Sequence, residues 1–156
     1  MRKIRIVCVG KNQKSYVSDG LADFEKRMRR YCDFQTVFVK EVSYRSGSQI
    51  QWAALEGKSL KKHISTDHLT IVCDEKGKSI TSFELSKQFT SWANRGYSQF
   101  NFLIGGAYGL SNEIKKAADF TLSLSSMTMT HQLVRLILAE QIYRAFTFIN
   151  GEKYHH

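Results

Sequence analysis

Short apolar runs alternate with amphipathic stretches along the whole chain of 156 residues. The apolar runs have the length and composition typical of buried strands, whereas the stretches between them have the periodicity of helices. We predict strands at 3–9, 36–42, 69–74, 100–104 and 120–124, and helices at 16–31, 49–63, 82–94, 111–118 and 130–149. Because strands and helices alternate, we expect a single α/β domain over residues 1–156, with a parallel sheet covered by helices in an α/β/α arrangement.

The last predicted helix, THQLVRLILAEQIYRAFTFING, is apolar around most of its circumference. Its polar stripe is narrow and consists of Glu140, Gln141, Arg144 and Thr147. A helix of this kind must be buried on more than one side. Since helices of a small α/β domain lie outside the sheet, we expect a second copy of the chain to cover it and predict a homodimer. A helix tucked centrally within one subunit is the alternative.

The composition adds a strong and uneven positive charge. The formal net charge is +9, and the first thirty residues hold nine Lys and Arg against three acidic residues. A one-sided basic surface is typical of nucleic-acid binding, because each cation at a phosphate releases a condensed counterion. We therefore predict an RNA or DNA partner and choose Lys26, Arg27, Arg29 and Arg30 as candidate contacts. Solubility alone, with a solvated helix face, is the alternative.

The three cysteines, Cys8, Cys32 and Cys73, are odd in number and form no C-x-x-C pair. This pattern indicates neither a disulfide framework nor a zinc site, and it fits a reducing cytoplasm. The start MRKIRIVCVG has too short an apolar run for a signal peptide, and no stretch approaches the length of a membrane span. We expect a soluble, cytoplasmic protein without a metal or a membrane partner.

Glycines follow the fourth predicted strand in the sequence QFNFLIGGAYGLS. The spacing of Gly105, Gly106 and Gly109 is not G-x-G-x-x-G, the turn follows a late strand, and no acidic ribose clamp ends a strand about twenty residues later. A P-loop is excluded because the G-K-[ST] ending is missing. A tight turn without a ligand would also explain these glycines.

The fifth predicted strand leads into TLSLSSMTMTHQ, in which residues 126–130 form a short loop of small polar residues and methionines. Thr130 is the candidate N-cap of the last helix. We expect this loop and the glycines to follow neighbouring strands, at the edge where parallel sheets bind ligands. Neither loop has an acidic cluster for a metal or a cation for a triphosphate. Main chain, hydroxyls and apolar surface instead favour a flat heteroaromatic ring.

Three segments, LIGGAYGL, LSLSSMTMTHQLVRLILAEQIYRAF and KYHH, resemble those of the SPOUT-class ribosomal RNA large subunit methyltransferase H family, also called YbeA-like. The resemblance covers the whole chain, including the start KIRIVCVGK, and is most specific in the last third. It implies a SPOUT fold with a deep C-terminal trefoil knot and an obligate homodimer. It also implies an S-adenosyl-L-methionine-dependent methyltransferase that acts on N3 of a pseudouridine in helix 69 of 23S rRNA.

The resemblance assigns the methyl-donor site to three segments of this chain. These residues are Cys73, Gly105, Gly106, Leu124, Ser125, Ser126, Met127, Thr128 and Met129. Cys73 stands where the family commonly has leucine, and plain core packing is its alternative role. Thr130 replaces the proline that usually precedes the histidine of this loop, and His156 replaces the usual Arg or Lys at the end of the tail.

Three residues are candidates for orienting the target base or for assisting loss of its N3 proton: His131, Tyr154 and His155. We expect His131 in the first turn of the last helix, where the helix dipole favours a neutral imidazole. A capping role is its alternative. The resemblance places the tail near the donor site of the partner subunit, whereas the alternative is a frayed terminus. Arg135 is a candidate for contacting a phosphate or an interface carboxylate.

Two other classes of function stay open at this point. One is a non-catalytic, basic protein that binds RNA or ribosomes and has a degenerate donor pocket. The other is a small nucleotide-dependent oxidoreductase. Titrations with S-adenosyl-L-methionine, NAD and ribosomal particles separate the three.

Overall fold

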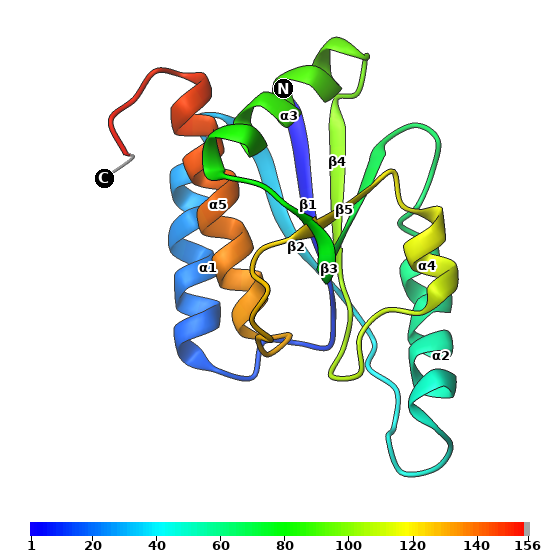
Figure 1. Ribbon diagram of the computed structural model, residues 1–156. Helices are drawn as coiled ribbons and strands as arrows, with labels where there is room; N and C mark the ends of the chain where they lie inside the picture. Colours follow the sequence, from blue (N-terminus) through cyan, green and yellow to red (C-terminus); the bar gives the residue numbers. More distant parts are fainter. Residues whose placement is uncertain (155–156) are drawn as a thin grey trace.

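The computed structural model describes residues 1–154, so His155 and His156 lie outside the described residues. Within them, five parallel strands form one sheet in the order β2-β1-β4-β3-β5 (Figure 1). The strands are β1 (Arg2–Val9), β2 (Cys32–Val39), β3 (Leu69–Ser79), β4 (Gln99–Ile104) and β5 (Phe120–Ser123). The helices are α1 (Ser15–Met28), α2 (Gln49–Lys61), α3 (Ser82–Asn94), α4 (Asn112–Ala117) and α5 (Leu133–Ile149).

The helices cover the two faces of the sheet in separate layers, which confirms the predicted α/β/α arrangement. Side chains alternate between the faces of a strand, so Ile4 and Ile6 of β1 join one core and Val7 and Val9 join the other. Helices α1, α3 and α5 complete the first, larger core. Helices α2 and α4 cover the opposite face through residues such as Leu60.

Helix α5 lies between α1 and α3 on the sheet, and this position buries most of its apolar surface within one subunit (Figure 1). Phe146 stacks on Phe89 of α3 at 5.4 Å and on Tyr31 after α1 at 5.8 Å. Thr147, expected on the polar stripe, is 1 % exposed, and its hydroxyl donates to the main-chain oxygen of Arg144. The apolar circumference therefore does not by itself require a second subunit, and the homodimer stays a prediction.

All ten predicted elements are present, but several boundaries differ. Strand β2 begins at Cys32 rather than at residue 36 and pairs with β1 along its whole length. The polar Asp33 and Gln35 hid this start, although such residues are tolerated on a strand at the edge of a sheet. Strand β3 runs on to Ser79, because it resumes pairing with β5 after an irregularity beyond Cys73. The described helices are too short or too polar to cross a membrane.

Candidate functional site

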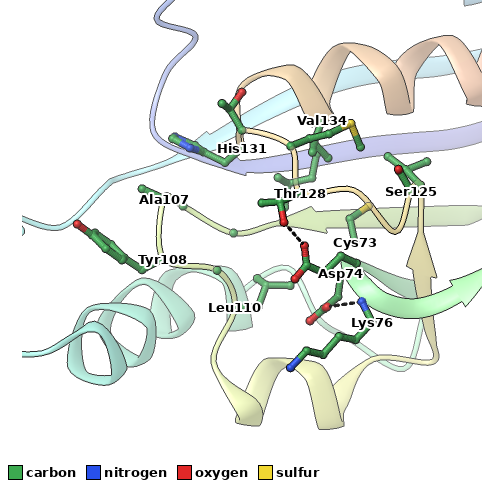
Figure 2. A pocket seen from close by; sticks show the side chains of 18 of the residues that line it. Cys73, Asp74, Lys76, Ala107, Tyr108, Leu110, Ser125, Thr128, His131 and Val134 are labelled. Atoms are coloured by element: carbon green, nitrogen blue, oxygen red, sulfur yellow. Dashed lines mark hydrogen bonds between the residues drawn. The ribbon is translucent and has the colours of Figure 1, made fainter.

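A pocket of about 740 Å³ opens at the carboxyl ends of β3, β4 and β5 (Figure 2). Its walls are the glycine turn (residues 105–109), the serine–methionine loop (residues 124–130) and the part of β3 from Cys73 to Lys76. The two loops were expected to follow neighbouring strands, but β3 lies between β4 and β5. The expectation was wrong because sequence order does not reveal which strand is inserted between two others. The volume is typical of a small-molecule site.

The glycine turn is too tight for side chains at its first positions. The N–H of Gly109 donates to the carbonyl of Gly106 at 3.0 Å, and Gly109 has a φ of 80°. A Cβ on Gly105 would lie 2.6 Å from the carbonyl carbon of Gly109, which real Cβ atoms do not tolerate. This part of the pocket wall is therefore bare main chain, which a ligand can approach closely.

A buried carboxyl group lies behind the glycine turn. Glu56 of α2 is 1 % exposed, and its Oε2 accepts hydrogen bonds from the Tyr44 hydroxyl at 2.7 Å and the Val42 N–H at 3.3 Å. Its Oε1 has no hydrogen-bond partner among residues 1–154. Burial raises the pKa of Glu56, and the bonds from Tyr44 and Val42 only partly oppose this rise. Glu56 was not predicted from the sequence. The pattern that could have revealed it is the position of its carboxylate at helical spacing from Ala53 and Leu60, on the buried side of α2.

The serine–methionine loop is held in place by its own hydroxyls. The Ser125 hydroxyl accepts from the N–H of Met127 at 2.9 Å, and Ser123 donates to the Ser125 carbonyl at 3.0 Å. The Thr128 hydroxyl donates to Glu75 at 2.9 Å and thereby ties the loop to β3 (Figure 2). The loop thus keeps a fixed shape without proline.

Most residues assigned to the donor site line this one pocket. They are Cys73, Gly105, Gly106, Leu124, Ser125, Met127, Thr128 and Met129, whereas Ser126 is not among the described lining residues. Burial, with Cys8 and Asp74 nearby, raises the pKa of Cys73 to about 12. Its thiol is therefore neutral and acts as an apolar surface that also packs against the larger core.

Asp74 and Lys115 add a charged pair to the pocket that the two loops alone did not reveal. Their side chains form an ion pair at 2.7 Å, and the N–H of Lys76 donates to Asp74 at 2.9 Å. Burial would raise the pKa of Asp74, but the bonds from Lys115 and Lys76 outweigh it and lower the pKa. The pocket therefore presents an ionised carboxylate, which suits a hydroxyl or ammonium group of a ligand.

His131 lines the pocket from the turn before α5, not from the first turn of that helix as expected. The helix begins at Leu133, whose N–H donates to the Thr130 hydroxyl oxygen at 3.1 Å, so Thr130 caps the turn that leads into α5. Burial and the charge of Arg135 lower the pKa of His131. The predicted neutral imidazole is therefore supported, but for a different physical reason. Figure 2 shows the ring at the outer side of the pocket, away from Cys73.

Arg135 has a structural task that sequence reasoning did not foresee. Its side chain is fully buried and donates to the carbonyls of Val9 at 2.6 Å and Gly10 at 2.8 Å and to the side chain of Asn12 at 3.1 Å. These bonds join α5 to the end of β1. The expected contact with a phosphate or an interface carboxylate is wrong, because the guanidinium is enclosed within the subunit.

Tyr154 lies beside α5, far along the helix from the pocket. Its ring packs edge-on against Tyr143 at 4.8 Å, and Arg144 donates to its main-chain oxygen at 2.7 Å. Leu133, where the helix begins at the pocket, is about 15 Å from Tyr143 along the axis. Tyr154 is not among the described pocket residues. One subunit therefore does not bring it to His131, and His155 lies outside the described residues.

The four basic candidates near the end of α1 are all exposed. Two have carboxylate partners, since Arg27 pairs with Asp23 at 2.8 Å and Arg30 pairs with Glu152 at 2.7 Å. Lys26 and Arg29 complete the group. No group of three or more His, Cys, Asp and Glu within residues 1–154 is arranged to hold a metal ion.

Comparison with known proteins agrees with this architecture. Residues 2–155 match a family described as a predicted SPOUT methyltransferase. The chain is 42 % identical to ribosomal RNA large subunit methyltransferase H of Halothermothrix orenii, over 98 % of this chain and 99 % of that protein. It is 38 % identical to the protein of that name from Streptococcus pneumoniae, over 98 % of this chain and 99 % of that protein.

Two solved structures share the fold at low sequence identity. TrmJ from Z. mobilis gives a TM-score of 0.56 at 10 % identity, over 94 % of this chain and 70 % of that one. A probable methylase family protein from Haemophilus influenzae gives a TM-score of 0.52 at 16 % identity, and the match covers 99 % of this chain and 70 % of that one. The resemblance noted in the sequence is confirmed: the chain belongs to the SPOUT methyltransferases, in the ribosomal RNA large subunit methyltransferase H family.

Proposed function

We propose that the protein uses S-adenosyl-L-methionine to methylate N3 of a pseudouridine in helix 69 of 23S rRNA, and that it does so as a homodimer. The observation that carries the proposal is that the glycine turn and the serine–methionine loop line the same pocket. The names of the curated relatives support an RNA of the large ribosomal subunit as the substrate.

The residues around the pocket fit this methyl donor. The bare main chain at Gly105 offers a close approach to a flat ring, and the apolar side chains of Leu124 and Met129 offer contact area. The carboxylate of Asp74 is a partner for the hydroxyl or ammonium groups of the donor. When bound, S-adenosyl-L-methionine supplies both the methyl group and its own leaving group.

The protein's own contribution is chiefly positioning, because displacement at a sulfonium needs the two reactants in line. The N3 proton of the base must also be removed. His131 lines the pocket and has a lowered pKa, so it is available as a neutral acceptor or as an orienting hydrogen-bond partner. Tyr154 and His155 are the other candidates for this role.

The distance of Tyr154 from the pocket supports a site shared between subunits. A tail that packs along α5 reaches a donor pocket only if the partner chain supplies that pocket. Helix α5 also keeps a half-buried face on which Leu133, Ile137 and Phe148 are joined by the polar Gln141 and Arg144. The exposed Phe83 of α3 lies next to this face, 5.4 Å from Phe148. A surface that mixes apolar and polar side chains in this way suits a partner subunit. The trefoil knot belongs to the same proposal.

A transfer assay with labelled donor tests this function. The purified protein is incubated with free 23S rRNA, large subunits or whole ribosomes from a strain that lacks its own enzyme, and the RNA is mapped by mass spectrometry. We expect one added methyl group on a helix 69 pseudouridine, at N3. Binding of ribosomal particles without transfer and without donor binding would instead identify a non-catalytic RNA-binding protein, and binding of NAD alone would identify an oxidoreductase.

A further inference from the structure

Three aromatic side chains form a cluster at the outer end of the pocket. We call Tyr44, Trp52 and Tyr108 the aromatic rim. Their ring centroids lie 4.9 to 5.2 Å apart. Tyr108 belongs to the glycine turn, lines the pocket and is 41 % exposed. Figure 2 shows it pointing away from Cys73, toward α2. The rim is therefore continuous with the pocket but lies outside its deep part.

Hydrogen bonds fix two of these rings at their polar ends. The Tyr44 hydroxyl donates to the buried Glu56, and the Trp52 indole N–H donates to the carbonyl of Ser46 at 2.8 Å. A Cβ on Gly106 would lie 2.9 Å from the Tyr44 hydroxyl, so the rim touches the glycine turn directly. The rings are thus held in place before any ligand arrives, which lowers the entropic cost of stacking on them.

The surface next to the rim combines apolar area with positive charge. A second hollow of about 470 Å³ is lined by Trp52, Leu55 and Lys58, among others. Leu55 is 48 % exposed, and two cations are exposed as well: Arg45, which follows Tyr44 in the chain, and Lys58, which lines the hollow with Trp52. Of the rim residues, Tyr108 is exposed, and Tyr44 and Trp52 are half-buried. Accessible aromatic rings beside cations are typical of surfaces that bind unpaired nucleotides, because the rings stack on bases and the cations contact the phosphates.

We propose that the aromatic rim stacks an unpaired RNA base that flanks the nucleotide entering the donor pocket. The inference rests on the proposed function, because it places the target base at the outer part of the pocket beside His131, in front of the donor, and the neighbouring base at the aromatic rim. A base must leave its stack to reach a reacting group inside a pocket, and a ring at the rim replaces part of the lost stacking. Trp52 and Tyr108 are positioning residues for the substrate.

Tryptophan fluorescence tests stacking without any methyl transfer. Trp52 and Trp92 are the two tryptophans of the chain, and Trp92 is 3 % exposed, so stacking at the rim alters chiefly the emission of Trp52. The probes are a single-stranded RNA and an abasic oligonucleotide with the same phosphates. We expect the single-stranded RNA, but not the abasic oligonucleotide, to quench the emission of Trp52. Trp52→Phe should still bind the RNA but should lose this quenching. Equal quenching by both probes, or persistent quenching in Trp52→Phe, overturns the proposal.

Steady-state kinetics on large ribosomal subunits gives the second test. Trp52→Ala should raise KM for the subunits about tenfold and leave donor affinity, measured by calorimetry, unchanged. Trp52→Phe should restore most of the loss, because its ring still stacks. The matched control is Ile50→Ala on the same helix, which removes an 83 % exposed apolar side chain without a ring and should change nothing. An unchanged KM in Trp52→Ala rejects the proposal.

Two other outcomes of these experiments still allow the proposal to be tested. If Trp52→Ala fails to fold in a thermal melt, Tyr108→Ala replaces it, because Tyr108 is exposed and its loss leaves the Trp52 indole bond in place. If the wild-type protein methylates no ribosomal substrate, the proposed function fails by itself. The fluorescence titration then decides alone whether the rim stacks RNA bases.

Discussion

The carboxyl group of Glu56 lies directly behind Gly106, since a Cβ on Gly106 would come within 2.7 Å of Glu56 Oε1. The oxygen has no partner in the part of the chain that the structure describes, and burial raises the pKa of its carboxyl group. The wall of the pocket at the glycine turn therefore lies against a group that resists ionisation. The absence of a side chain on Gly106 leaves room for it.

The raised pKa of Glu56 predicts a specific pH dependence of stability. The folded state holds this proton at a pH where the unfolded chain, with a pKa near 4.5, has already lost it. The contribution is fully present below that value and is lost as the pH rises through the raised folded pKa. Glu56→Gln cannot titrate, so the stability of the wild type relative to this variant should fall as the pH rises. Urea unfolding of both proteins at several pH values measures this, and parallel profiles would refute the prediction.

The glycine turn predicts a separation between stability and donor binding. Gly105→Ala places a Cβ against the main chain of Gly109 and should cost about 1–3 kcal/mol of stability. It should also weaken donor affinity at least tenfold by calorimetry, because the wall must shift. Gly96→Ala is the matched control, since Gly96 has a φ of 97° and no atom near its Cβ position. The control should lose stability through backbone strain but bind the donor normally, and equal donor affinity in both variants would show that the turn is not the site.

Much of this architecture could be predicted because it depends on local patterns. Apolar runs, helical periodicity, the glycine turn and the serine–methionine loop can all be recognised from consecutive residues. The order of the strands in the sheet cannot, so the insertion of β3 between β4 and β5 was missed. The same holds for Asp74 with Lys115 and for Glu56 with Gly106, which meet only through tertiary packing. An arginine is ordinarily assigned to a surface even in a mostly apolar helix, and nothing local revealed that Arg135 is fully buried.

The hydrogen bonds of Arg135 predict that the shape of its guanidinium group contributes more to stability than its positive charge does. Arg135→Lys keeps the charge but cannot reach the carbonyls of Val9 and Gly10 together with Asn12. We expect a loss of about 2–4 kcal/mol, because buried main-chain carbonyls are left without donors. The exposed Arg27→Lys should stay within about 0.5 kcal/mol of the wild type in the same urea titration. A similar effect of the two changes would contradict the structural role of Arg135.

A site shared between subunits predicts complementation between two variants that are impaired in different ways. Truncation after Lys153 removes Tyr154 and His155, and it should spare donor binding but abolish methylation. Gly105→Ala should reduce methylation through the pocket instead. Co-expression of the two chains with different tags, followed by purification of the mixed dimer, should restore activity, because one pocket and one tail are intact in the same complex.

Each variant purified alone gives the background, and sedimentation velocity measures whether each forms a dimer. A mixed dimer no more active than its parent variants, or a truncated protein with full activity, would show that the tail takes no part in the reaction.

The most direct test of the account is a crystal structure of the protein with S-adenosyl-L-methionine. We predict the adenosyl group between residues 105–109 and the loop at 124–130, with the methyl group directed toward an opening that the tail of the partner subunit completes. A donor bound elsewhere on the surface, or a monomer in which these two segments do not touch the same ligand, would contradict it.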